Sequence, residues 1–210
     1  MIIRQGFSGS ASAIALIFAG IMLGTAPSYA EEKSAQQIID GLKITRTRSI
    51  SEPARLPLSA DDRAFVKRVR GLKRSLSMDD RNQMDALVTK RPTIDLDVNF
   101  DYDSAALTPK VEPQLNSLGR ALAASELSGS IVMLGGHTDG KGGDQYNQGL
   151  SERRAETVKR FLVDHYHIPA ENLVTAGYGK QGMKNPNDPF AAENRRVQIS
   201  NVEGRDEATR

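Results

Sequence analysis

An arginine and an aspartate in the second half of the chain have the types and the spacing to hold a charged ligand. Asp139 closes the segment Gly136-His137-Thr138-Asp139, just after the apolar run 131–134. Arg154 falls on the apolar face of a helix expected over about 144–166, whereas Arg153 falls on its polar face. A guanidinium keeps its charge, and an unpaired buried charge is strongly unfavourable. We therefore expect a carboxylate or a bound anion to meet Arg154, and Asp139 is the best-placed carboxylate in the sequence.

Two interpretations of this pair follow from the residues alone. The first is a structural ion pair that only stabilises the fold. The second is a receptor for a zwitterion, such as an amino-acid head group, whose ammonium would contact Asp139 and whose carboxylate would meet the bidentate fork of Arg154. The residues themselves leave both interpretations open.

The elements that must position these residues are indicated by the hydrophobic periodicity. Apolar residues alternate with polar ones from Thr93 to Phe100, which predicts a strand with one face on a core. Apolar residues at helical spacing then predict a helix over about 111–122. Two β-α units with an added strand would give an α+β fold with a mixed sheet covered by helices on one face. The strands and helix that complete this pattern are expected at 131–134, 144–166, 173–176 and 197–200.

The segment before this domain is predicted to have two parts. Residues 31–58 carry two prolines and little apolar periodicity, so we expect a flexible basic tether. Residues 59–90 are expected to form a short helical segment, in which Ser59 and Ser77 begin two helices. The apolar stripes of these helices need a surface to cover, and the candidates are each other, the following domain or a partner protein.

The two ends of the chain carry further signals. Residues 1–30 resemble a secretory signal peptide, with Arg4, an apolar stretch and the cleavage signal Ser28-Tyr29-Ala30. We expect cleavage after Ala30, and the alternative is an N-terminus retained as a membrane anchor. Residues 203–210 are charged and are expected to form a disordered tail.

Composition excludes several classes of site. The 210 residues contain no cysteine, so a disulfide framework, a thiolate metal site, a cysteine nucleophile and a lipid-modified cysteine are all excluded. The formal net charge is only +2, which argues against a dedicated nucleic-acid binder. His137 and Asp139 have no second histidine at metal-ligand spacing, so no metal and no cofactor are expected.

Several short motifs follow one another along the second half of the chain. They are Asn99-Phe100-Asp101-Tyr102-Asp103-Ser104, Gly136-His137-Thr138-Asp139, Asn147, Leu150-Ser151, Arg154-Ala155, Gly177-Tyr178-Gly179 and Asn194-Arg195-Arg196-Val197. In this order and at these separations, they resemble the OmpA-like peptidoglycan-binding domain of outer-membrane porin tails, peptidoglycan-associated lipoproteins and flagellar stator proteins. The resemblance implies an OmpA-like two-layer sandwich of the βαβαββ type over residues 91–202, preceded by the helical segment.

The same resemblance implies the ligand and its contacts. In the family the ligand is the diaminopimelate of the cell-wall stem peptide, whose side-chain end carries an ammonium and a carboxylate. Asp139 and Arg154 match the residues that grip it, which favours the zwitterion receptor over the structural ion pair. The further ligand-binding residues that the resemblance implies are Phe100, Asp101, Asn147 and Arg196.

The sequence therefore predicts a non-catalytic periplasmic protein, associated with the outer membrane, that binds peptidoglycan non-covalently and links the cell wall to the outer membrane or to envelope machinery. An outer-membrane or envelope protein that contacts residues 31–90 is the further expected partner, and no nucleic acid is expected. A protein-docking module of the envelope and a cell-wall hydrolase are the alternatives.

Overall fold

The computed structural model describes residues 32–44, 58–72, 75–98, 100–101 and 103–205. The predicted signal peptide with its cleavage site lies outside these residues. None of the described helices is both long enough and apolar enough to cross a membrane. The elements are α1 Ala35–Leu42, α2 Ala60–Val69, α3 Met78–Val88, β1 Thr93–Leu96, α4 Glu112–Ala123, β2 Ile131–Gly136, α5 Asp144–Tyr166, β3 Leu173–Gly177 and β4 Val197–Glu203, with short 3-10 turns at Ala170–Asn172 and Ala192–Asn194.

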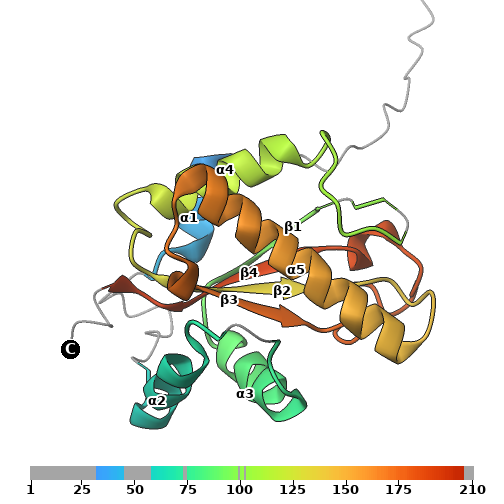
Figure 1. The fold of residues 1–210 in the computed structure, drawn as a ribbon, viewed down its shortest axis with the longest axis horizontal. Coiled ribbons are helices and arrows are strands. Elements are labelled where there is room, and N and C mark those ends of the chain that lie inside the picture. The colour runs from blue at the N-terminus through green and yellow to red at the C-terminus, as the bar shows by residue number, and fades with distance from the viewer. Residues whose placement is uncertain (1–31, 45–57, 73–74, 99, 102, 206–210) are drawn as a thin grey trace, which may run out of the picture.

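The four strands form one mixed sheet in the order β1-β4-β2-β3. Strands β2 and β3 run parallel, whereas β4 runs antiparallel to both of its neighbours. From β1 to β4 the chain follows the predicted βαβαββ order, and the connection from β2 to β3 is the long helix α5 (Figure 1). The prediction of an α+β fold with a mixed sheet is confirmed.

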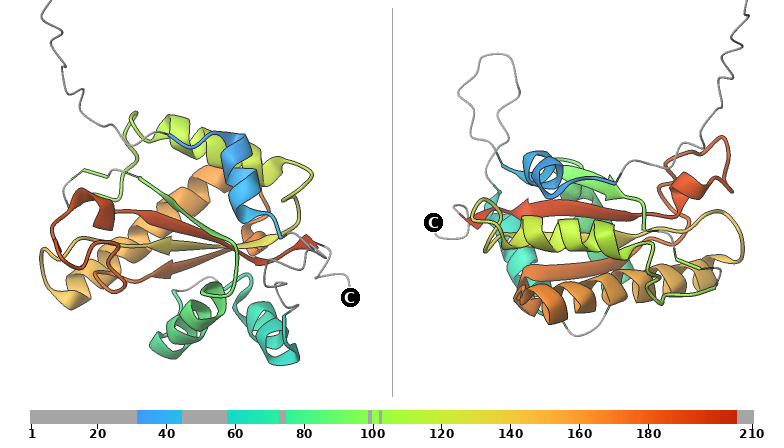
Figure 2. Two further views of the ribbon diagram at one scale, coloured as in Figure 1. Left: turned by 180° about the vertical axis from the view of Figure 1, so that it is seen from behind. Right: turned by 90° about the horizontal axis from the view of Figure 1, so that it is seen from above.

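Helices α1, α4 and α5 share one hydrophobic core with one face of the sheet. Side chains in a strand alternate between faces, so Val132 and Leu134 of β2 point into this core. Helix α5 packs along β2 and β3, and α4 packs beside it (Figure 2). The helix that carries Arg154 is thus fixed against strands β2 and β3.

The opposite face of the sheet is covered by α2 and α3. Ile131 and Met133 of β2 point to this side and form a second buried cluster with Phe65 and Met84 of the two helices. Figure 1 shows α2 and α3 together on the side of the sheet away from α4. The helices α4 and α5 of the domain thus lie on one face, as predicted. Of the three surfaces considered for the preceding helices α2 and α3, the one they cover is the sheet of the following domain.

The starts of these two helices agree with the sequence prediction. The Ser59 hydroxyl accepts a hydrogen bond from the amide of Asp62, and the Ser77 hydroxyl accepts one from the amide of Asp80. Each serine satisfies an amide that has no partner within its helix, which fixes where the helix begins.

Residues 35–42 correct the prediction of a flexible tether over 31–58. They form α1, in which Ser34 and Gln37 make a reciprocal capping box. Ile38 and Leu42 are fully buried against α4 and β1, so tertiary packing stabilises a helix too short to persist alone. Residues 45–57 lie outside the described part of the chain. At the other end, β4 continues to Glu203, one residue into the predicted tail, and residues 206–210 lie outside the described part.

Candidate functional site

An open pocket of about 750 Å³ lies where the segment after β1, the loop after β2 and the first half of α5 meet. Five of the six residues predicted to bind ligand line this pocket, although they come from three separate segments of the chain. They are Phe100, Asp101, Asp139, Asn147 and Arg154.

Arg154 projects from the buried face of α5 and is only 4% exposed. Its Nε donates to the carbonyl of Ser104 at 3.0 Å, and its Nη2 donates to the carbonyl of Asp101 at 3.3 Å. Its Cζ lies 4.9 Å from the centre of the Phe100 ring, a cation-π arrangement. Arg153 is exposed, as the helical periodicity predicted.

Both hydrogen-bond acceptors of this guanidinium are neutral backbone carbonyls. Among the described residues, no carboxylate forms an ion pair with it. Burial lowers the pKa of Arg154 below its usual value, and the nearby positive charge of Arg195 lowers it further. Arginine has five N–H donors, and these two hydrogen bonds leave three of them for another acceptor. The pocket therefore presents a buried cation with donors available for an anion.

Asp139 lines the same pocket but pairs with a different arginine. Its Oδ2 lies 2.9 Å from Nη1 of Arg195, and its Oδ1 accepts from the amide of Lys141 at 3.2 Å. The expected direct pair between Asp139 and Arg154 is therefore not formed. Arg195 lies closer to the carboxylate, so the two predicted residues face the pocket as separate charges.

Backbone contacts fix the position of Asp139 at the end of β2. The amide of His137 donates to the carbonyl of Arg196 at 3.0 Å, and the amide of Thr138 donates to the carbonyl of Gly179 at 2.8 Å. The buried side chain of Asn147 donates to the carbonyl of Lys141 at 2.9 Å and holds the following loop. Asn147 thus shapes the wall of the pocket from the first turn of α5.

Two glycines and a serine explain how α5 approaches the strand ends so closely. A Cβ on Gly136 would collide with the backbone carbonyl of Ser151, and one on Gly177 would lie 2.6 Å from the Ser151 hydroxyl. That hydroxyl donates to the carbonyl of Gln148 at 2.8 Å and accepts from the amide of Gly179 at 2.9 Å. The motif residues at these positions hold the helix against the sheet beneath the pocket.

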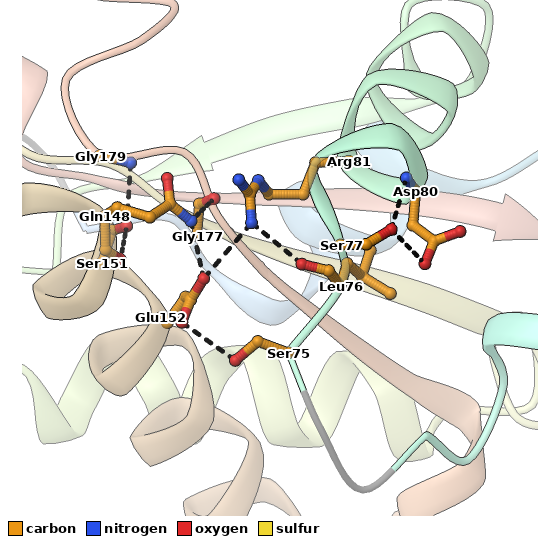
Figure 3. A network of polar contacts seen from close by, with 10 residues as sticks. All are labelled: Ser75, Leu76, Ser77, Asp80, Arg81, Gln148, Ser151, Glu152, Gly177 and Gly179. Atoms are coloured by element: carbon orange, nitrogen blue, oxygen red, sulfur yellow. Dashed lines mark hydrogen bonds and ion pairs between the residues drawn. The ribbon is translucent and has the colours of Figure 1, made fainter. Parts of the chain in front are cut away.

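A polar network joins the preceding helices to the same part of α5 (Figure 3). Glu152 accepts from the hydroxyl of Ser75 at 3.0 Å and from Nε2 of Gln148 at 2.7 Å, and it lies 3.5 Å from Nη1 of Arg81. Gln148 also donates to the carbonyl of Gly177 at 2.7 Å. The segment 75–81 is therefore connected to the helix and the strand end that support the pocket.

Arg196 is the one predicted ligand-binding residue that the structure does not bring to the pocket. Its Nε donates to Asp95 Oδ1 at 3.1 Å and its Nη2 to the carbonyl of Gly182 at 3.0 Å, so the buried guanidinium is held beside β1. Arg195 lines the pocket in its place. Consecutive side chains at the entry to a strand point to opposite sides, so only one of the two arginines can face the ligand.

Other residues of the pocket were not predicted from the sequence. Arg195 belongs to one of the sequence motifs but was not among the predicted ligand-binding residues. Asp103 and Lys141 add two more charged side chains to the lining of the pocket. Tyr146 and Phe190 line the rim and are 46% and 66% exposed. The position of Tyr146 one residue before Asn147 was a signal that could have found it, whereas nothing in the pattern around Phe190 marks it.

His137 takes a packing role close to the site. Its ring stacks on Tyr178 with centroids 5.2 Å apart, and its Nδ1 lies 3.1 Å from the carbonyl of Gln181. Burial lowers its pKa to about 4, so the imidazole is neutral near pH 7 and Nδ1 is the donor. Within the described ranges no group of three or more histidine, aspartate or glutamate side chains could hold a metal ion.

Comparison with known proteins identifies the class of this domain. The OmpA family model matches residues 99–197. The chain is 41% identical over 93 residues to outer membrane protein A of Escherichia fergusonii, covering 44% of this chain and 37% of that protein. It is 38% identical over 101 residues to a peptidoglycan-associated lipoprotein of Pseudomonas aeruginosa, covering 48% and 58%. The matched segment is thus a minor part of the first relative and somewhat over half of the second.

Among solved structures, the OmpA-like domain of FopA1 from Francisella tularensis aligns with 30% identity and a TM-score of 0.46, covering 51% of this chain and 71% of that one. By the family match, residues 99–197, somewhat under half of the chain, form an OmpA-like domain.

Proposed function

We propose that this protein binds peptidoglycan non-covalently through the diaminopimelate of the stem peptide. The observation that carries the proposal is Arg154, a buried guanidinium in an open pocket that has only neutral protein acceptors. A ligand carboxylate would supply the missing negative charge, and the planar fork suits a bidentate contact.

Asp139 is the proposed acceptor for the ammonium at the same end of diaminopimelate. A carboxylate has about four acceptor sites, and the contacts with Arg195 and the Lys141 amide occupy two of them. Both charges of a zwitterion then find partners of opposite sign in one pocket, which favours a ligand that carries both.

The proposed role in the cell is to link the cell wall to the outer membrane or to envelope machinery, from the periplasm. Its support is the relatives, among them an outer membrane protein A and a peptidoglycan-associated lipoprotein. Export by a signal peptide that is cleaved after Ala30, and a partner that contacts residues 31–90, belong to the same proposal.

A sedimentation assay with purified, diaminopimelate-containing peptidoglycan tests the proposal. We expect the protein to sediment with the wall, to release no soluble fragments and to be displaced by free meso-diaminopimelate. Asp139→Asn keeps the size of the side chain and removes its charge, so retention should fall by about tenfold or more. The matched control is Asp164→Asn, the same change at an exposed position in the last turns of α5.

Each alternative has its own result in this assay. Release of muropeptides by the wild-type protein would indicate a hydrolase. Failure to sediment with the wall would favour a protein-docking module. Unchanged retention of a folded Asp139→Asn variant would remove Asp139 from the site.

A further inference from the structure

The pocket is larger than the zwitterionic end of one amino acid requires. Its volume of about 750 Å³ falls in the range of sites that enclose ligands of drug size. Beyond the charged residues, its rim carries the partly exposed rings of Tyr146 and Phe190. Resting on the proposed function, we propose that these two rings form a second subsite, which takes the amide planes and alanine methyl groups of the stem peptide next to diaminopimelate.

Phe190 is held in place although its side chain is 66% exposed. The fully buried side chain of Asn194 donates to the carbonyls of Asp188 and Pro189 at 2.9 and 3.2 Å, and it accepts from the amide of Asn185 at 2.9 Å. The amide of Phe190 donates to the carboxylate of Asp188 at 3.1 Å. A loop braced in this way presents the ring at a fixed place, so little ordering is required when a ligand binds.

The same loop is fastened to the loop that follows Asp139. The amide of Gly140 donates to the carbonyl of Pro189 at 2.7 Å. The two segments approach so closely that a Cβ on Gly140 would lie 2.9 Å from Cβ of Pro189. The aromatic wall and the proposed ammonium acceptor are therefore held at a constant separation.

Tyr146 supplies the other ring of the subsite. It lies in the first turn of α5, and its hydroxyl donates to the carboxylate of Asp103, which anchors the ring from the segment after β1. An aromatic ring offers a large apolar contact surface at a small cost in side-chain entropy. Two anchored rings beside a zwitterion site match a ligand in which an uncharged peptide continues from the charged end.

Calorimetric titration with three ligands tests the subsite: free meso-diaminopimelate, a stem tetrapeptide with diaminopimelate followed by alanine, and the same tetrapeptide joined to its sugars. We expect the wild-type protein to bind the tetrapeptide about five- to tenfold more tightly than free diaminopimelate, the size of effect of one aromatic contact. Phe190→Ala removes one of the two rings, so the preference of this variant for the tetrapeptide over free diaminopimelate should shrink to the small part that Tyr146 supplies. Met78→Ala, at a residue on α3 that is 67% exposed and outside the pocket, is the control and should leave this preference unchanged.

The outcomes separate this inference from the proposed function. If the wild-type protein binds none of the three ligands, the proposed function fails. If it binds free diaminopimelate and Phe190→Ala binds the tetrapeptide as tightly as wild type, the function stands and the subsite is refuted. A gain that appears only with the sugar-bearing ligand would refute the peptide as its occupant.

Discussion

Nη1 of Arg195 lies 2.9 Å from Oδ2 of Asp139, so the carboxylate proposed to receive the ligand's ammonium already has a cationic partner. Both side chains are partly exposed, which keeps the energy of this pair modest. The pair orients the carboxylate toward the pocket, and it places a second guanidinium close enough to Arg154 to lower its pKa. The pocket is thus built around two arginines, of which only Arg195 pairs with Asp139.

Substitution of Arg195 should mainly reduce binding to peptidoglycan, whereas substitution of Arg196 should mainly reduce the stability of the fold. Arg195→Ala removes a partly exposed pair, so the free energy of unfolding should fall by only about 0 to 1 kcal/mol, while wall retention falls several-fold because Asp139 loses its orientation. Arg196→Ala leaves Asp95 without its buried partner and should cost about 3 kcal/mol or more. Urea unfolding and sedimentation with peptidoglycan measure the two effects. Equal loss of retention in two equally stable variants would contradict this assignment.

Arg154→Lys tests the planar fork rather than the charge. A lysine ammonium is a compact charge and cannot make the bidentate contact of a planar guanidinium, so the affinity for meso-diaminopimelate should fall about tenfold or more. Calorimetry measures the affinity, and thermal unfolding shows whether the variant is folded. Arg153→Lys is the matched control on the exposed side of α5. Full affinity in Arg154→Lys would show that charge alone is sufficient.

His137 should make the stability of the protein depend on pH. Burial, together with the positive charge of Arg196, lowers its pKa to about 4, whereas hydrogen bonding to the Gln181 carbonyl and the charge of Asp95 act in the opposite direction. The folded state then binds fewer protons than the unfolded state, where histidine titrates near 6.5. Stability is fully present above about pH 6.5 and falls as the pH is lowered toward 4, by about 3 kcal/mol in all.

Urea unfolding at pH 7 and pH 4.5 checks this dependence. His137→Gln has no group that titrates there, so its stability should change less over the same interval. An identical pH dependence in wild type and variant would assign the effect to other groups.

Helix α1 should contribute to the stability of the whole domain. Leu42 is fully buried in the core with α4 and the sheet, so Leu42→Ala should lower the free energy of unfolding by about 2 to 5 kcal/mol. The exposed Gln36 of the same helix provides the control, and Gln36→Ala should stay within about 0.5 kcal/mol of wild type. Urea unfolding followed by circular dichroism compares the two. Similar stability for both variants would show that α1 is only loosely attached.

The features that could be predicted from the sequence are those that depend on local periodicity. The order of strands and helices from Thr93 onward and the inward direction of Arg154 follow from alternation and helical spacing, and both agree with the structure. Helix α1 was missed because eight residues give a weak signal, even though Ser34 and Gln37 form a capping box. Its stability comes from contacts with α4, which lie some 80 positions further along the chain, as between Lys33 and Gln114.

The remaining errors concern side chains whose direction is set by tertiary contacts. A motif that contains two adjacent arginines does not say which one faces the ligand, because Arg195 follows a 3-10 turn and its orientation depends on the entry into β4. The prediction that Asp139 pairs with Arg154 was wrong for the same reason, since the position of Arg195 beside Asp139 also depends on tertiary contacts. Phe190 lies in an irregular loop whose shape depends on the buried Asn194 and on a contact with Gly140, neither of which has a periodic signature.

The covering of the second sheet face by α2 and α3 also limits how this domain can be transferred between genes. The segment 99–197, which matches the OmpA family model, contains Met133 and Val174. Their side chains are covered by α2 and α3, which lie outside that segment. A gene rearrangement that transferred only this segment to another protein would expose those apolar side chains to solvent, and the exposed patch would favour self-association of the product. Residues 58–72 and 75–98 would have to be transferred together with it, so the structural unit of this protein is larger than the segment that matches the OmpA family model.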